Sequence, residues 1–236
     1  KHWDTLIEGG YSMSGKRILI ILGGIYHDFE GFASAVRPIL ERAGHTVQTT
    51  YDLEALARLG DAEYDLVMSY TSLSSRREGQ GDTHPETLSA SQTDRLIHWV
   101  GDGGAFLSVH CGTVSSASNV KLKALLGGVF LSHPPAFTFT VYPSAREHPI
   151  IAGISAFCVE DEFYIQDYAP SLDVHMVAID RGIAYPMVWS RREGKGRVAN
   201  ITMGHSEKVW GLEAYQRLML QAIDWLTDTT GEGGEP

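Results

Sequence analysis

Short apolar runs alternate with amphipathic helical segments through the first half of the sequence. The runs are typical of strands that are buried on both faces of a sheet: Arg17–Leu22, His45–Thr50, Tyr64–Ser69 and Ala105–Val109. The segments between them have helical spacing over residues 29–43, 53–59 and 89–100. Strands that alternate with helices join into parallel sheets. The sequence therefore predicts an α/β fold with a mainly parallel sheet.

The second half of the sequence has a different pattern. Extended or alternating segments follow one another with few helices between them: Phe137–Tyr142, Val159–Ile165, His175–Ile179, Tyr185–Ser190 and Arg197–Met203. Such segments predict a mixed or antiparallel extension of the sheet. Residues 193–196 (Glu-Gly-Lys-Gly) are typical of a hairpin turn, and Leu212–Leu226 has the spacing of an amphipathic closing helix.

No repeat or linker divides the 236 residues, and this length lies within the range of a single α/β domain. We therefore expect one domain over residues 16–228. An N-terminal arm (1–15) precedes it and a disordered tail (229–236) follows it in this prediction. The polar stretch Tyr70–Thr87 has a length typical of a loop that covers a site.

Charge and cysteine content limit the class of partner. The chain carries 19 Lys and Arg against 29 Asp and Glu, a formal net charge of −10, which argues against a nucleic-acid or anionic membrane surface. We expect a small-molecule partner instead. The cysteines have no metal-type spacing, and no apolar run approaches the roughly 20 residues that span a bilayer. These features indicate a cytoplasmic protein. The glycine pair after the first strand matches no dinucleotide-binding pattern, so no dinucleotide cofactor is expected.

Imidazoles follow three of the predicted strands. His27 comes soon after the first strand, His110 directly follows Ala105–Val109, and His205 follows Arg197–Met203. We expect the three side chains to lie close together at the carboxyl edge of the sheet. Imidazole exchanges protons near neutral pH or binds a metal such as zinc, so the cluster favours acid–base catalysis or a divalent metal site. The alternative is that each ring only satisfies a backbone hydrogen bond.

Several separate motifs resemble the trehalose-utilisation ThuA-like family. They follow one another in the family's order between Lys16 and Leu226: Ser132-His133-Pro134, His148-Pro149-Ile150, Asp161-Glu162-Phe163-Tyr164, and Trp189 through Gly194-Lys195-Gly196-Arg197 to Gly204-His205. The family is similar in fold to class I glutamine amidotransferases, so the resemblance implies a flavodoxin-like, doubly wound core. It also implies a role in sugar catabolism, often beside oxidoreductases that act on disaccharides, without defining the reaction.

The amidotransferase comparison bears on Cys111. Those enzymes place a nucleophilic Cys at the turn after the fourth strand and a His-x-Glu pair near the chain end. Here His110 has the nucleophile's position and Cys111 comes one place later, while His205-Ser206-Glu207 keeps the other pair. Neighbouring side chains at such a turn point in different directions, so Cys111 does not inherit the exposed position. We expect no glutaminase activity, and a Cys-dependent hydrolase would require Cys111 to be exposed and ionised.

A second cluster supplies an acidic group. Asp161 and Glu162 are adjacent in an extended segment, so they point to opposite faces, and Tyr164 shares the face of Glu162. We assign Glu162 to the pocket. The alternative is that both carboxylates cap turns or pair with arginines. The predicted substrate contacts are His27, Cys111, His133, Asp161 and Tyr164, and the aromatic side chains on which a sugar could stack are Tyr26, Tyr70 and Trp210.

These features combine into one functional hypothesis. We expect a homo-oligomeric enzyme that acts on a sugar or 3-keto-sugar by isomerisation, epimerisation or elimination, with His110, His205 and Glu162 as the acid–base groups. A divalent metal such as zinc, held by His27, His110 and His205, would polarise the sugar carbonyl. The alternative is a non-catalytic sugar-binding or regulatory protein on the same scaffold, because fold alone does not imply catalysis.

Overall fold

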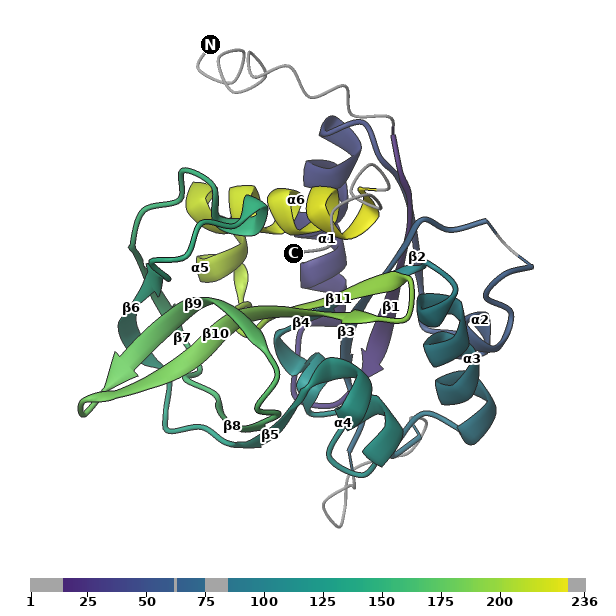
Figure 1. The fold of residues 1–236 in the computed structure, drawn as a ribbon, viewed down its shortest axis with the longest axis horizontal. Helices are drawn as coiled ribbons and strands as arrows, with labels where there is room; N and C mark the ends of the chain where they lie inside the picture. Colours follow the sequence, from purple (N-terminus) through teal and green to yellow (C-terminus); the bar gives the residue numbers. More distant parts are fainter. Residues whose placement is uncertain (1–14, 62, 75–84, 229–236) are drawn as a thin grey trace.

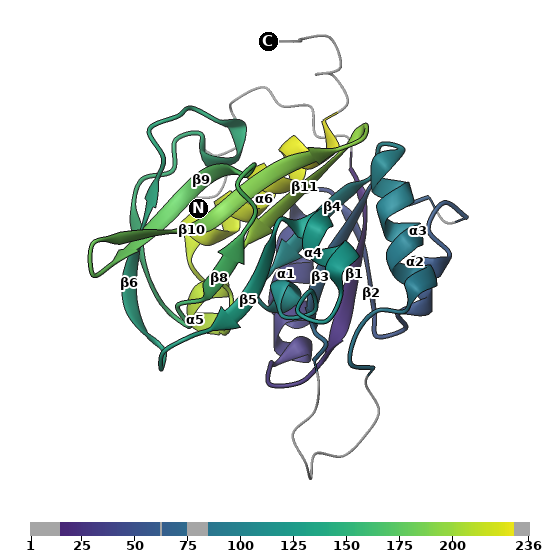
Figure 2. The same ribbon diagram turned by 60° about the horizontal axis from the view of Figure 1, so that its bottom comes forward.

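The computed structural model describes residues 15–61, 63–74 and 85–228. Its centre is a nine-stranded sheet with the order β2-β1-β3-β4-β11-β10-β9-β6-β7 (Figures 1 and 2). The first five strands in this order are parallel: β2 (Thr46–Thr50), β1 (Arg17–Gly24), β3 (Leu66–Ser72), β4 (Ala105–Val109) and β11 (Gly196–Ile201). This is the strand order of flavodoxin-like, doubly wound folds. The predicted parallel core is confirmed.

The remaining four strands of the sheet form the antiparallel extension that the second half of the sequence predicts. They are β10 (Ile183–Glu193), β9 (Asp173–Asp180), β6 (Phe137–Pro143) and β7 (Phe157–Asp161). The turn from β10 to β11 contains Gly194 at a φ of 58°, a left-handed conformation that glycine adopts without strain. The predicted hairpin is therefore present.

Helices cover both faces of the parallel core, because alternate residues of each strand point to opposite sides. In β1, Ile18 and Ile20 pack in the core with α1 (Phe29–Arg42) and α6 (Glu213–Thr227), whereas Leu19 packs on the other face. That second face is covered by α2 (Glu54–Ala57), α3 (Ala90–Gly101) and α4 (Val120–Leu126), as Figure 2 shows. None of the helices in the described part of the chain is long and apolar enough to cross a membrane.

Three local predictions need correction. Val159–Ile165 is not one extended segment, because β7 ends at Asp161 and a new strand, β8 (Ile165–Tyr168), begins after Tyr164. β8 pairs with β5 (Gly128–Ser132), which sequence pattern did not indicate, in a separate two-stranded sheet. The start of the predicted covering loop is wrong as well, since Tyr70 to Ser72 belong to β3. Part of the rest of that loop lies outside the described residues. The predicted arm and tail lie almost wholly outside them.

The stacked imidazoles of His148 and His175 predict that stability depends on pH. His175 on β9 is buried and stacks on His148, with ring centroids 3.9 Å apart. Burial, and then the charge of His148, lower the pKa of His175 from 6.5 to about 4, although Asp173 works to raise it. The unfolded chain binds this proton more readily than the folded chain, so protonation of His175 favours unfolding. The stability that depends on a neutral His175 is therefore fully present above pH 6.5 and is lost as pH falls through about 4.

We expect the free energy of unfolding to decrease between neutral pH and about pH 4, and His175→Asn to remove part of that dependence. The lowered pKa of His175 corresponds to a decrease in the free energy of unfolding of roughly 3 kcal/mol at most. Chemical denaturation at several pH values measures the dependence of unfolding free energy on pH, with His98→Asn, an exposed residue of α3, as the matched control. An unchanged slope in His175→Asn would show that protonation of this ring does not matter.

Candidate functional site

Three tight turns at the carboxyl edge of the parallel core present the imidazoles. His27 follows Tyr26, which has a φ of 69°, and His110 itself has a φ of 44°. Such left-handed conformations cost a non-glycine residue on the order of 1 kcal/mol. Gly204, just before His205, has a φ of 133°, and a Cβ there would lie 2.6 Å from the Tyr215 hydroxyl. Each turn is therefore held in a strained or glycine-only shape directly beside its imidazole.

The predicted meeting of the three rings is found in the structure. The ring centroid of His27 lies 5.0 Å from that of His110 and 5.0 Å from that of His205. The rings of His110 and His205 are 5.4 Å apart. His110 is completely buried, whereas His27 and His205 are only partly buried. The core therefore encloses His110, and the partly buried His27 and His205 give the cluster its contact with solvent.

Glu162 lies at the centre of this cluster. Its Oε2 is 3.4 Å from Nε2 of His110 and 3.3 Å from Nδ1 of His205. Its other oxygen, Oε1, is 3.5 Å from Nε2 of His133, whose side chain is about one-third exposed. Because β7 ends one residue earlier, Glu162 is free of the strand ladder and turns toward the imidazoles. A single carboxylate therefore touches three imidazoles.

Backbone carbonyls fix which nitrogen of two rings carries a proton. Nδ1 of His110 lies 2.8 Å from the carbonyl oxygen of Thr202, and Nδ1 of His27 lies 3.0 Å from that of Ile25. A carbonyl oxygen only accepts, so each Nδ1 donates its N–H. In the neutral rings, Nε2 then presents a lone pair to the interior of the cluster.

Electrostatics give the groups of the cluster different protonation states. Burial, and then the charge of His110, lower the pKa of His27 to about 3, so this ring is neutral at physiological pH. Contact with Glu162 outweighs burial and raises the pKa of His205 above 6.5. Burial works to raise the pKa of Glu162, but His110 and His205 together lower it well below its usual value. Glu162 is therefore ionised, and its contact with His205 favours the protonated form of that ring.

Asp161 supports the site from behind. Its side chain is buried and accepts hydrogen bonds from the backbone N–H groups of Gly204 (2.7 Å), His205 (3.2 Å) and Glu162 (2.9 Å). One carboxylate thus joins the end of β7 to the turn that carries His205. Asp161 is a predicted substrate contact, but its oxygens are occupied by the backbone, so we give it a positioning role.

Tyr164 forms one wall of the cluster. Its ring lies 4.3 Å from that of His110, and its hydroxyl is 3.4 Å from Nε2 of His27, close enough to donate a long hydrogen bond. The ring of His133 stacks 5.8 Å from Tyr164. The structure therefore brings His27, His133 and Tyr164 together with the three proposed acid–base groups.

Three predicted contacts are buried, although the ring of Tyr70 packs against those of His27 and His110. Cys111 is fully buried in the core, and burial raises the pKa of its thiol. This environment disfavours the ionised thiol that a Cys-dependent hydrolase requires. Tyr70 and Trp210 are also buried, and their hydroxyl and indole N–H donate to the carbonyl oxygen of Gly204. They support the His205 turn and offer no surface on which a sugar could stack. Tyr26 remains exposed.

Sequence reasoning missed Thr202, which contributes to the site through its backbone. Its carbonyl oxygen orients His110, and its hydroxyl accepts a hydrogen bond from Gln166 of β8. A backbone carbonyl is present at every residue, so no residue type signals this role. Only the pairing of β11 with β4 places Thr202 beside His110.

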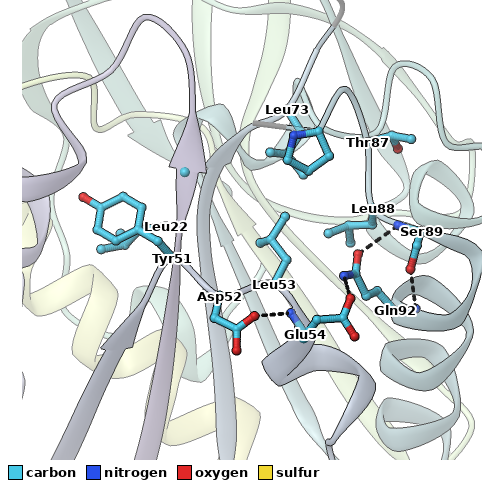
Figure 3. A pocket seen from close by; sticks show the side chains of 12 residues that line it. Leu22, Tyr51, Asp52, Leu53, Glu54, Leu73, Thr87, Leu88, Ser89 and Gln92 are labelled. Atoms are coloured by element: carbon cyan, nitrogen blue, oxygen red, sulfur yellow. Dashed lines mark hydrogen bonds between the residues drawn. The ribbon is translucent and has the colours of Figure 1, made fainter. Parts of the chain in front are cut away.

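A cavity of about 440 Å³ is lined by other residues than those of the cluster (Figure 3). Its floor is apolar, with Leu22, Leu53 and Leu88, and its polar lining includes Glu54 and Gln92, which form a hydrogen bond of 2.6 Å. None of the three clustered imidazoles lines this cavity. The convergence of titratable groups, rather than cavity volume, therefore locates the candidate site.

Solved structures show the same fold. A ThuA-like protein from Parabacteroides merdae is 16% identical with a TM-score of 0.74, and the match covers 94% of this chain and 93% of that one. A cytoplasmic protein from Salmonella typhimurium LT2 is 15% identical with a TM-score of 0.64, covering 89% of this chain and all of the other. A β-galactosidase from Bacillus circulans sp. alkalophilus is 9% identical with a TM-score of 0.56, and the match covers 89% of this chain but only 31% of the enzyme.

Curated proteins include no match to this sequence. The family comparison is decisive, because the model described as trehalose utilisation (ThuA) matches residues 17–226. This range contains all of the clustered residues and every strand of the sheet. The chain belongs to the ThuA, or trehalose utilisation, family.

Proposed function

We propose that the protein is an enzyme that transfers a proton next to the carbonyl group of a sugar or 3-keto-sugar. The main support is the position of Glu162, an ionised carboxylate in contact with His110, His205 and His133 at the carboxyl edge of the sheet. Open α/β sheets bind their ligands at this edge. The family description, trehalose utilisation, supports a substrate derived from a disaccharide.

In the proposed reaction, some groups of the cluster act on the carbonyl oxygen of the sugar and another acts on the neighbouring carbon. On one side, His110 and His205 face the carbonyl oxygen, and His205 gives its proton to that oxygen as charge develops there. On the other side, Glu162 takes the proton from the neighbouring carbon, whose C–H bond breaks to form an enediol. In each outcome a carbonyl forms again as one enediol hydroxyl returns a proton to His205. If Glu162 returns its proton to the other carbon the result is isomerisation, and if it returns it to the opposite face of the same carbon the result is epimerisation. In elimination a group on the next carbon leaves and takes the proton from Glu162.

His133 connects the reaction to solvent. Its Nε2 faces the oxygen of Glu162 that points away from His110 and His205, and its side chain is partly exposed. A proton received by Glu162 can therefore pass to His133 and then to water. The same path lets solvent protons reach the site.

Solvent exchange tests the proposal directly. We expect the wild-type protein to incorporate deuterium from D₂O at the carbon next to the carbonyl of a 3-keto-disaccharide, faster than the uncatalysed exchange. Mass spectrometry of a panel of 3-keto-sugars and their parent sugars measures the rate, and Glu162→Gln should abolish the acceleration. A wild-type protein that binds these sugars but accelerates no exchange would be a sugar-binding or regulatory protein instead.

A further inference from the structure

We propose that His27, His110, His205 and Glu162 together bind a divalent cation such as Zn²⁺. The inference deepens the proposed function and rests on it for the role of the cation, which is to polarise the sugar carbonyl. Each of the four residues offers one ligand atom, and these atoms all lie within 4.8 Å of one another. Two nitrogen ligands of one zinc ion are about 3.4 Å apart, so small side-chain rotations complete the site.

The orientation of the rings is that of metal ligands. His27 and His110 donate Nδ1–H to the carbonyl oxygens of Ile25 and Thr202, which leaves Nε2 as the lone-pair nitrogen on the cluster side. Metal-bound histidines almost always donate their other N–H to a carbonyl or carboxylate in this way. Two backbone carbonyls therefore prepare two imidazoles for a cation.

Two buried nitrogen atoms in the cluster lack a hydrogen-bond partner among the described residues. They are Nε2 of His110 and Nδ1 of His205. Both lie 3.3–3.4 Å from Oε2 of Glu162, but neither contact has the alignment of a hydrogen bond. Buried polar atoms are rarely left without a partner. A cation between the two nitrogens and the carboxylate would satisfy all three atoms at once.

A second His–Asp group in the described chain shows what a non-ligating arrangement looks like. His148, Asp173 and His175 also bring their donor atoms within 4.8 Å of one another. However, the two rings stack face to face at 3.9 Å with an interplanar angle of only 21°. Imidazole lone pairs lie in the ring plane, so stacked rings do not direct them at a common point. We therefore assign the cation to the first group alone.

The cation refines the division of roles in the site. The three imidazoles and Oε2 of Glu162 hold it, and the carbonyl oxygen of the sugar completes its coordination. Oε1 of Glu162 faces His133 and stays available for the proton. With the cation bound, His205 is a ligand, and the cation takes over its role of stabilising charge on the carbonyl oxygen. Glu162 and His133 keep the proton path to solvent.

Metal titration of the full chain tests the inference without any sugar. After removal of metals with a chelator, we expect the wild-type protein to bind one equivalent of Zn²⁺ in competition with a chromophoric indicator, and Co²⁺ to give visible absorption bands. His27→Ala and Glu162→Gln should each lower the affinity at least about 10-fold. His98→Asn and His175→Asn, which lie outside the group, should bind as the wild type does. Circular dichroism checks that each variant is folded.

The outcomes separate the cation from the proposed function. No stoichiometric binding by the wild type, or equal binding by a folded His27→Ala, would overturn the inference. Full sugar turnover by the metal-free protein would also overturn it and leave the proposed function intact. Stoichiometric binding that depends on His27 and Glu162, without turnover of any sugar, would support the cation site and contradict the proposed function.

Discussion

His110→Asn should lower turnover of the sugar substrate by about 100-fold or more while the chain stays folded. Asparagine fills a similar space, and its side-chain amide can still donate to the carbonyl oxygen of Thr202, the partner of His110 Nδ1. It lacks the second ring nitrogen that faces Glu162. The substitution therefore removes the chemistry of the ring and keeps most of its structural contacts. Steady-state kinetics and thermal unfolding monitored by circular dichroism measure the two effects separately.

A matched substitution makes this result specific. His98→Asn changes an exposed imidazole on α3 whose Nδ1 contacts the carbonyl oxygen of Asp94, and it should alter neither turnover nor melting temperature. Glu162→Gln should reduce turnover as His110→Asn does, because the neutral amide accepts no proton. If His110→Asn keeps full turnover but melts at a lower temperature, His110 is structural, and the sugar-binding alternative becomes the better interpretation.

Asp161→Ala should destabilise the fold by about 3 kcal/mol or more and also impair turnover. The substitution leaves the N–H groups of Gly204, His205 and Glu162 without their acceptor, and each buried unsatisfied donor costs about 1–3 kcal/mol. His205 and Glu162 then lose the backbone link that sets their distance. Chemical denaturation measures the loss of stability, and kinetics well below the melting temperature measure the loss of positioning.

Asp161→Asn distinguishes positioning from general stability. The amide keeps one acceptor oxygen, so the fold should lose less stability, but only part of the Gly204 and His205 contacts can be restored. We expect its kcat to fall while the KM changes little, because the sugar does not contact this side chain. Glu160→Gln, an exposed carboxylate one residue earlier on β7, is the control and should affect neither quantity. Equal kinetics for the Asp161→Asn variant and the wild type would contradict the positioning role.

Sequence pattern determined the parallel core of this protein because burial on both faces leaves a clear local signal. Runs such as Ile18–Leu22 are apolar throughout, and the helices between them carry one apolar stripe each. The pair β5 and β8 left no comparable signal, since both strands are short and only partly buried. Their pairing joins segments more than 30 residues apart in the sequence, which a local pattern does not reveal.

Residue type also indicated the members of the candidate site. An imidazole after each of three strands, and a carboxylate beside a tyrosine, were enough to select His27, His110, His205, Glu162 and Tyr164. Topology alone brings strand ends together at one edge, so their proximity followed from the fold class. Side-chain alternation separated Asp161 from Glu162 without deciding which of them meets the imidazoles. The structure decides it, because β7 ends at Asp161 and Glu162 turns toward the cluster.

Tertiary structure alone decided how these groups are arranged and which of them are accessible. The backbone carbonyl of Thr202, the bond from Asp161 to the Gly204 turn and the burial of Cys111 come from segments far apart in the sequence. No residue type encodes such contacts, since a backbone carbonyl is the same at every position and burial depends on what packs above it. The sequence thus determined which chemical groups reach the edge of the sheet. Packing determined their protonation, their orientation and which of them a sugar can meet.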